Sequence, residues 1–481
     1  MANKVKRNRI PSPIASAIPI IFLISSLVAL LIVKGTDAIF DNSQLILLSA
    51  AALAFAISRI FYPCRWKMLM TGLYKSAKQI IPAIPILLLI AMVSATWMFG
   101  GIVPSLIYYG LEFINPETFL AVTCIVCSVI SVLTGSSWTT CATIGIAFMG
   151  IGSIMGYNEA WIAGAVISGA YFGDKMSPLS DTTVLAASTT GVKLFDHIKY
   201  LFITTTPAML IALTVYLIIG LNISNTGSSH NDELITHLTS TFNISPWLLL
   251  APVITCALIV MRINVLLTLA ISTVLGIIGL IFFEPQLLAH LASGSNKFMA
   301  IINLLLTDTS INTNNELLNE LVTTGGVKDM MNTIYLILSA MVFGGVMLGT
   351  GMLSSITRSC LKGVKKTSSA VSTTVGSGLF MNSCTGDQYL SIIITANLFK
   401  NLYKKLGLEP RLLGRSIEDS VSVTSVLIPW NSCGITQSTV LGVATLSYLP
   451  FCIFNYMCPI MSIIIAAIGY KISTNSRPKD C

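Results

Sequence analysis

Apolar runs of near-membrane length recur along the whole chain, and they constrain its fold more than any other feature. About 20 apolar residues span the hydrocarbon core of a bilayer as a helix. Only 10% of the 481 residues are charged and 54% are hydrophobic, whereas soluble domains carry about 25% charged residues. The sequence therefore predicts an all-α polytopic membrane protein. The clearest runs are 14–33, 44–62, 81–100, 199–220, 246–261, 263–283, 331–353 and 450–470.

Loop charge predicts the sidedness of these spans. Basic residues gather at both chain ends and in the loops 59–78, 193–199, 358–366 and 400–415. The loops 222–245 and 298–327 contain Asp and Glu but neither Lys nor Arg. Because basic loops stay on the cytoplasmic side, we expect residues 1–13 and 472–481 in the cytoplasm and 222–245 outside. The net charge of +8 then reflects orientation, and no nucleic-acid partner is expected.

Polar clusters, Gly and Pro interrupt the apolar pattern in four places. The segment 367–400 has two apolar arms that are too short to cross separately, so we expect a re-entrant hairpin there, and a matching hairpin over 116–155. The segments 160–189 and 414–447 must each cross once, as broken helices.

These interruptions recur in the two halves of the chain, 14–221 and 246–471. Thr134-Gly135 corresponds to Thr385-Gly386, and the Gly-x4-Asp pattern ending at Asp174 corresponds to the one ending at Asp419. The offsets are all about 250 residues, as internal repeats require, and the charge topology makes the repeats inverted. Inverted repeats with discontinuous helices are typical of secondary transporters, whose sites lie at the membrane midplane. We expect about ten transmembrane helices plus the two hairpins.

The segment 169–183 places several polar groups at membrane depth. An ionised side chain there costs about 2.5–3.5 kcal/mol, so it usually marks an ion or substrate path. Asp174 and Asp181 flank Pro178, which opposes a continuous helix and frees backbone carbonyls. With the hydroxyls of Ser177, Ser180 and Thr182, they predict a site that binds Na⁺ and H⁺ in turn.

Other residues complete the predicted site. Asp387 lies at the second hairpin tip and is expected to help bind the cation or proton. Capping and interfacial snorkelling are the alternatives for Asp174 and Lys175, and a cytoplasmic-end salt bridge with Arg411 or Arg415 is the alternative for Asp419. The supporting residues are Lys175, Thr134, Ser136, Thr385, Asp419, Asn431 and Ser432.

The run Gly-Ala-Tyr-Phe-Gly-Asp-Lys-Met-Ser-Pro-Leu-Ser-Asp-Thr-Thr at 169–183 resembles the signature of the NhaC family of Na⁺/H⁺ antiporters. The Thr-Gly tips and the Pro-Trp-Asn-Ser-Cys-Gly break at 429–434 fit the same family. The resemblance implies an ion-transporter-superfamily fold in the cytoplasmic membrane of a prokaryote, and Na⁺/H⁺ exchange. Val184 stands where the family pattern leads us to expect Asn, which bears on substrate identity.

We therefore expect a transporter and not an enzyme, with Na⁺ and H⁺ as cargo and no cofactor. The alternative is a Na⁺- and H⁺-coupled exchanger of organic anions such as malate and lactate, or of amino acids, on the same fold. A passive channel is a further alternative. We do not expect an intramembrane aspartyl protease, because protease catalysis gives no reason for inverted repeats. The expected partners are the lipid bilayer, small cations, an organic anion in the alternative function, and a second copy of the chain by analogy of fold.

Overall fold

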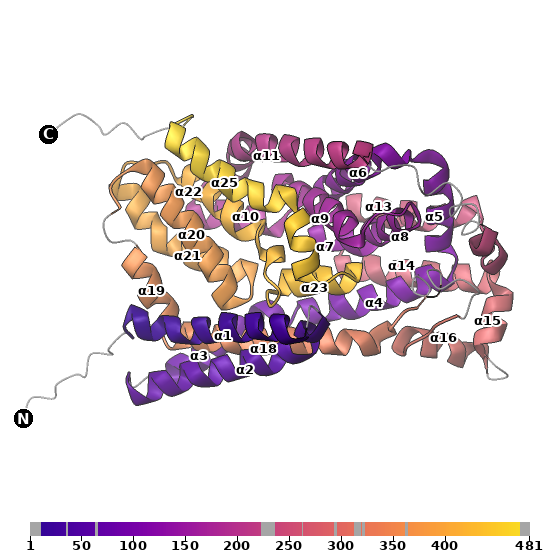
Figure 1. Cartoon of the computed structure of the whole chain (residues 1–481), viewed down its shortest axis with the longest axis horizontal. Coiled ribbons are helices and arrows are strands. Elements are labelled where there is room, and N and C mark those ends of the chain that lie inside the picture. Colours follow the sequence, from indigo (N-terminus) through magenta and orange to yellow (C-terminus); the bar gives the residue numbers. More distant parts are fainter. Residues whose placement is uncertain are drawn as a thin grey trace, which may run out of the picture.

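The computed structural model describes residues 11–34, 37–62, 66–222, 236–261, 263–292, 296–311, 319, 323–360 and 364–471. Within them the chain is helical, and the single β-type pairing is an isolated bridge between Thr309 and Thr324. The long helices run roughly along one direction (Figure 1). The predicted tail 472–481, residues 1–10 and the loop centre 223–235 lie outside the described residues.

The helices follow one another in the order of the predicted segments. In the first half they are α1 (Pro13–Lys34), α2 (Asp37–Ile60), α3 (Trp66–Ile80), α4 (Ala83–Phe99), α5 (Ile102–Phe113), η1 (Pro116–Thr118), α6 (Phe119–Thr134), α7 (Ser137–Thr140), η2 (Cys141–Gly145), α8 (Ile146–Ile154), α9 (Glu159–Met176), α10 (Asp181–Thr190) and α11 (Leu194–Asn222). In the second half they are η3 (Pro246–Leu249), α13 (Leu250–Val260), α14 (Val265–Phe282), α15 (Pro285–Ala292), α16 (Lys297–Leu306), α18 (Gly326–Gly349), α19 (Met352–Cys360), α20 (Thr367–Thr385), α21 (Gln388–Lys405), α22 (Pro410–Ile417), η4 (Glu418–Ser422), η5 (Ser425–Leu427), α23 (Ser432–Leu441), α24 (Thr445–Tyr448), η6 (Leu449–Phe451) and α25 (Ile453–Ile468).

Several of these helices are long and apolar enough to cross a bilayer. Among the described residues there are seven, or up to nine if the bent pairs α4–α5 and α24–α25 each count as one span. The bends are 66° and 57°. This confirms the predicted all-α polytopic membrane fold. Two of the seven, Pro116–Thr134 and Ser137–Ile154, are the arms of the segment 116–155, so each arm is long enough to cross by itself. The re-entrant hairpins, the number of about ten crossings and the inverted orientation of the repeats stay predictions.

Close packing of α6 against α9 positions the polar run. Gly169 and Gly173 lie on the face of α9 that meets α6. A Cβ on Gly169 would lie 2.2 Å from the Cys124 carbonyl oxygen, and one on Gly173 would lie 2.4 Å from the Ser131 Cβ. Only glycine allows the two backbones to approach so closely. The C-terminal end of α9 is thereby held beside the tip that follows α6.

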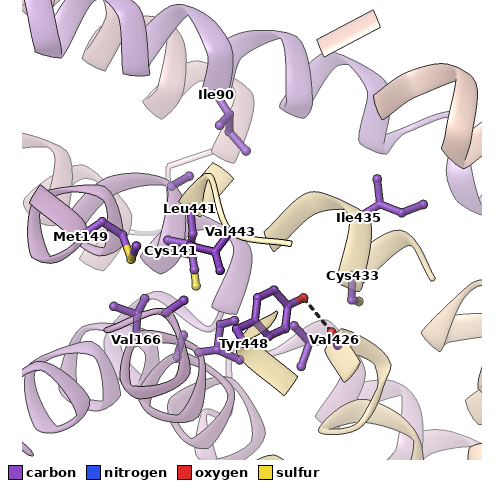
Figure 2. Packing of buried hydrophobic residues seen from close by; sticks show 14 of the residues in the cluster. Ile90, Cys141, Met149, Val166, Val426, Cys433, Ile435, Leu441, Val443 and Tyr448 are labelled. Carbon is purple, nitrogen blue, oxygen red and sulfur yellow. Dashed lines mark hydrogen bonds between the residues drawn. The ribbon is translucent and has the colours of Figure 1, made fainter. Parts of the chain in front are cut away.

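The two halves share one apolar core. Cys141, Met149 and Val166 from the first half pack against residues of 426–448 in the second (Figure 2). Within the second half, the Tyr448 hydroxyl donates a hydrogen bond to the Val426 carbonyl oxygen (2.8 Å). Segments almost 300 residues apart are thus held in one body. The first turn of α1 and the last turn of α25 lie toward the same end of the molecule (Figure 1).

Candidate cation-binding site

The polar run forms a break between two helices. α9 ends at Met176 and α10 begins at Asp181, with Pro178 between them. Ser177 has the extended backbone (φ −83°, ψ 133°) that a residue before proline prefers. The Ser180 hydroxyl then accepts the Thr183 N–H (3.4 Å) and caps α10. Proline and a serine cap together account for the interruption.

The first hairpin tip packs directly onto this break. Gly135 ends α6 in the left-handed conformation (φ 69°), and a Cβ there would lie 2.6 Å from the Leu179 Cβ. The Ser177 hydroxyl donates to the Val132 carbonyl oxygen (2.7 Å), and the Ser131 hydroxyl donates to the Ala170 carbonyl oxygen (2.5 Å). Tip and break are therefore one hydrogen-bonded unit.

Asp174 lies at the junction of the tip and the break. Its Oδ2 accepts the Ser137 N–H (3.2 Å) and the Ser137 hydroxyl (2.7 Å), and its Oδ1 accepts the Ser180 hydroxyl (2.5 Å). Three donors stabilise a carboxylate charge that is only partly exposed. Both serine hydroxyls also carry lone pairs that can turn toward a cation. This is the best-formed oxygen cluster of the predicted site.

A cavity of about 600 Å³ opens at Asp174. Its charged lining residues, among the described residues, are Asp174 and Asp181. Carboxylate, hydroxyl and amide oxygens are the ligands that hard cations prefer. The neutral oxygen-bearing side chains that line it are Thr134, Ser136, Thr139, Thr182, Gln388 and Tyr389.

The predicted residues of the first half differ in whether they line the cavity. Asp174, Asp181, Thr182, Thr134 and Ser136 share the cavity. Asp181 is exposed, and its carboxylate takes no hydrogen bond from any described residue. Ser180 reaches the cavity through Asp174, whereas Ser177 turns to the Val132 carbonyl and does not line it. Of the two aspartates, Asp174 is therefore the better-placed ligand, because it has the preformed donors.

The second hairpin tip packs against the second break. Asp387, at this tip, does not line the cavity. The Asp387 carboxylate accepts the Leu390 N–H (2.8 Å) and caps α21. The Thr385 hydroxyl donates to the Asp387 carbonyl oxygen (2.9 Å), and the Ser432 N–H donates to the Gly386 carbonyl oxygen (2.8 Å). Asn431 caps α23 through the Cys433 N–H (3.1 Å). These residues hold the tip, and the neighbours of Asp387, Gln388 and Tyr389, reach the cavity instead.

Lys175 joins the two broken helices. Its ammonium forms a buried ion pair with Asp419, and the Thr204 hydroxyl donates to the same Asp419 oxygen (3.0 Å). Lys175 therefore pairs with Asp419 and not with the neighbouring carboxylate of Asp174. The alternative of a cytoplasmic-end salt bridge for Asp419 is wrong, since Asp419 is fully buried and pairs with Lys175.

Comparison with known proteins assigns the chain to a family. The sequence profile of the Na⁺/H⁺ antiporter family matches residues 169–470, starting at the first residue of the polar run. The chain is 35% identical over 427 residues to the Na⁺/H⁺ antiporter NhaC of Bacillus subtilis (strain 168), covering 88% of this chain and 91% of that protein. The chain belongs to the NhaC family of Na⁺/H⁺ antiporters. The resemblance carried by residues 169–183 is confirmed.

Other relatives of this NhaC-family chain carry different names. It is 33% identical over 466 residues to the arginine/ornithine antiporter ArcD of Halobacterium salinarum, covering 96% of this chain and 93% of the relative. It is 34% identical over 407 residues to the malate-2H⁺/Na⁺-lactate antiporter of Bacillus subtilis, covering 84% and 85%. The family thus includes proteins named for organic cargo.

Four residues at the cavity of this NhaC-family chain were not predicted as site residues from the sequence. Ser137 supplies two of the three donors to Asp174, and Thr139, Gln388 and Tyr389 line the cavity. All four follow a Thr-Gly tip within five residues, so the tip motif itself was the signal. No group of three or more His, Cys, Asp or Glu suited to a resident metal occurs within the described part of the chain.

Proposed function

We propose that this protein exchanges Na⁺ for H⁺ across the cytoplasmic membrane of a prokaryote. Basic loops favour cytoplasmic termini. The first turn of α1 and the last turn of α25 lie toward the same end of the molecule (Figure 1). The family assignment and the relatives named Na⁺/H⁺ antiporter support this reaction. The transported Na⁺ and H⁺ are the substrates, and we expect no cofactor. The bilayer, and a second copy of the chain, are the proposed partners.

The observation that carries the proposal is the Asp174 carboxylate with its three donors at the mouth of an oxygen-lined cavity. When Na⁺ binds, the carboxylate supplies the charge and the Ser137 and Ser180 hydroxyls supply neutral oxygens. When Na⁺ leaves, a proton neutralises the same carboxylate, since a half-buried negative charge without a cation is costly. Competition between the two ions for one group is sufficient for antiport.

Asp181 and Thr182 have a different part in this proposal. Asp181 is exposed to the cavity and adds a second negative charge, which attracts cations toward Asp174. The Thr182 hydroxyl lies 3.0 Å from that of Ser180 and extends the oxygen cluster. Asp387, Thr385, Asn431 and Ser432 hold the second tip, and so position Gln388 and Tyr389.

Uptake of ²²Na⁺ into proteoliposomes under an imposed pH gradient tests the proposal. We expect uptake by the wild type, loss of uptake in Asp174→Asn, and weaker uptake in Asp181→Asn. Asp308→Asn is the matched control, because it makes the same chemical change in a carboxylate that is 56% exposed and lies outside the cavity. Wild-type uptake by Asp174→Asn would show that the site is assigned wrongly.

The cavity also favours a second candidate, the exchange of an organic solute that carries an amino group. A volume of about 600 Å³ holds far more than one Na⁺, and Trp138 and Tyr389 offer aromatic walls. The lining charges among the described residues are carboxylates, which suit a cationic amino acid and repel malate or lactate unless Na⁺ binds first. The relative named for arginine and ornithine supports this candidate.

Everted vesicles distinguish the two candidates. Collapse of a pH gradient by Na⁺ alone supports Na⁺/H⁺ exchange. A response that needs added arginine, ornithine, malate or lactate supports organic exchange.

A further inference from the structure

A second cluster of charged side chains is buried outside the cavity lining. Lys175 and Asp419 pair at its centre and are 1% and 0% exposed. The Lys175 ammonium also lies 3.6 Å from the Cys458 Sγ. This cluster joins α9 to η4, the π-helical turn of the second broken segment, so it connects the two halves at the level of their breaks.

Glu418 adjoins this pair without belonging to it. The Glu418 side chain is 0% exposed, and neither of its carboxyl oxygens has a hydrogen-bond partner within the described part of the chain. The Ser422 hydroxyl, on the next turn of the same π-helix, lies close enough to act on the Glu418 carboxyl, but the two groups form no hydrogen bond of ordinary geometry. An ionised carboxylate with no donor is very costly in such surroundings, whereas the protonated carboxyl costs far less. The surroundings therefore suit a proton on Glu418 in this conformation.

The groups around Glu418 do not remove this cost. Lys175, Asp174 and Asp419 act on it through space, but Lys175 is already paired with Asp419. Arg415, one turn earlier, makes no ion pair with Glu418 and lies 4.7 Å from the centre of the Tyr200 ring. α20, which packs against η4, carries no charged residue. The elements packed against η4 carry further charged and titratable groups, and a buried imidazole lies beside α22. They are Cys384, Tyr389, Lys400, Tyr403, Lys404, Lys405, Arg411, Cys458, Tyr456, Asp181 and His197.

We propose that Glu418 is a second proton-carrying site, which adds one proton to each exchange cycle beyond the one displaced at Asp174. This inference rests on the proposed Na⁺/H⁺ exchange and deepens it. Asp174 and Lys175 are consecutive residues of the last turn of α9. Because Na⁺ replaces a proton at Asp174, the charge of that site does not change, and the coupling acts through the shared helix turn. A shift of this turn when Na⁺ binds moves the Lys175 ammonium toward Glu418, which favours release of the Glu418 proton. Departure of Na⁺ favours its return, so the two sites are coupled reciprocally.

The charge moved per cycle distinguishes one proton from two. With protons from both Asp174 and Glu418 exchanged for one Na⁺, net charge crosses the membrane and transport responds to voltage. Proteoliposomes with a valinomycin-set K⁺ potential and no pH gradient measure this response. We expect the potential to drive ²²Na⁺ movement in the wild type and in Glu409→Gln. In Glu418→Gln we expect Na⁺/H⁺ exchange under a pH gradient to persist but its voltage response to vanish.

Glu409→Gln is the matched control, since it makes the same chemical change in a carboxylate that pairs with Arg411. If the voltage responses of Glu418→Gln and the wild type are equal, the inference is overturned, as it is if the wild type exchanges Na⁺ for H⁺ without any voltage response. A wild type that never exchanges Na⁺ for H⁺ overturns the proposed function itself. Should Glu418→Gln not fold, Glu418→Asp replaces it: a shifted pH midpoint of the voltage-driven flux supports the inference, and an unshifted midpoint overturns it.

Discussion

The buried ion pair between Lys175 and Asp419 makes a sharp prediction about stability. Both side chains are buried, and within the described residues Asp419 has one further donor, the Thr204 hydroxyl. Lys175→Met leaves the buried Asp419 carboxylate without its cation. Breaking a buried pair from one side costs about 3–5 kcal/mol. We expect Lys175→Met to lower the free energy of unfolding by that amount.

A double-mutant cycle isolates the interaction. Lys175→Met combined with Asp419→Asn removes both charges and keeps an acceptor for Thr204, so the double variant should lie within about 2 kcal/mol of the wild type. The assay is denaturant unfolding of the detergent-solubilised protein, followed by tryptophan fluorescence. The exposed pair Lys328–Asp308 is the control, and Lys328→Met should cause no measurable change. Additive effects of the two single variants would refute the buried pair.

Three further predictions concern helix packing, the cation site and the buried carboxyl group of Glu284. Gly173→Ala should destabilise the protein by about 1–3 kcal/mol, because its Cβ would lie 2.4 Å from the Ser131 Cβ and 2.5 Å from the Ser128 carbonyl oxygen. Gly376→Ala, where the added Cβ meets nothing within 4 Å, should not destabilise it in the same unfolding assay. Ser180→Ala should raise the Na⁺ concentration for half-maximal exchange about tenfold, since a hydrogen bond to a charged group contributes about 1.5–3 kcal/mol; exposed Ser188→Ala should leave it unchanged. Burial raises the pKa of Glu284 to about 7, against the opposing hydrogen bond from the Asn243 N–H. Because the folded pKa exceeds the unfolded value of 4.5, the wild type should lose stability relative to Glu284→Gln as the pH rises from 4.5 through 7, and parallel pH profiles would contradict this.

Local sequence was a good guide wherever helix geometry follows from neighbouring residues. Pro178 and the Thr-Gly tips lie where α9 and α10 separate and where the hairpin arms turn. The sequence did not reveal α3 as a packed helix, because Lys67, Lys75 and Lys78 resemble a cytoplasmic loop. In the structure α3 is amphipathic, and a Cβ on Gly72 would lie 2.5 Å from the Gly349 nitrogen of α18.

Side-chain partners were harder to predict than helices. Lys175 and Asp419 are 244 residues apart, so their pairing depends on how the two breaks face each other. The direction in which Asp387 points likewise depends on backbone conformation, since its carboxylate caps α21. Asp174 was identified correctly as a cavity residue, but its donor Ser137 comes from another segment. Tertiary contacts of this kind leave no periodic pattern in one sequence.

Proton release on Na⁺ addition tests the central claim most directly, namely that Asp174 exchanges H⁺ for Na⁺. The purified protein is held in weakly buffered detergent solution with a pH-sensitive dye, and choline chloride controls for ionic strength. We predict proton release by the wild type and by Asp308→Asn, and none by Asp174→Asn. Release from Asp174→Asn equal to that of the wild type would contradict the account.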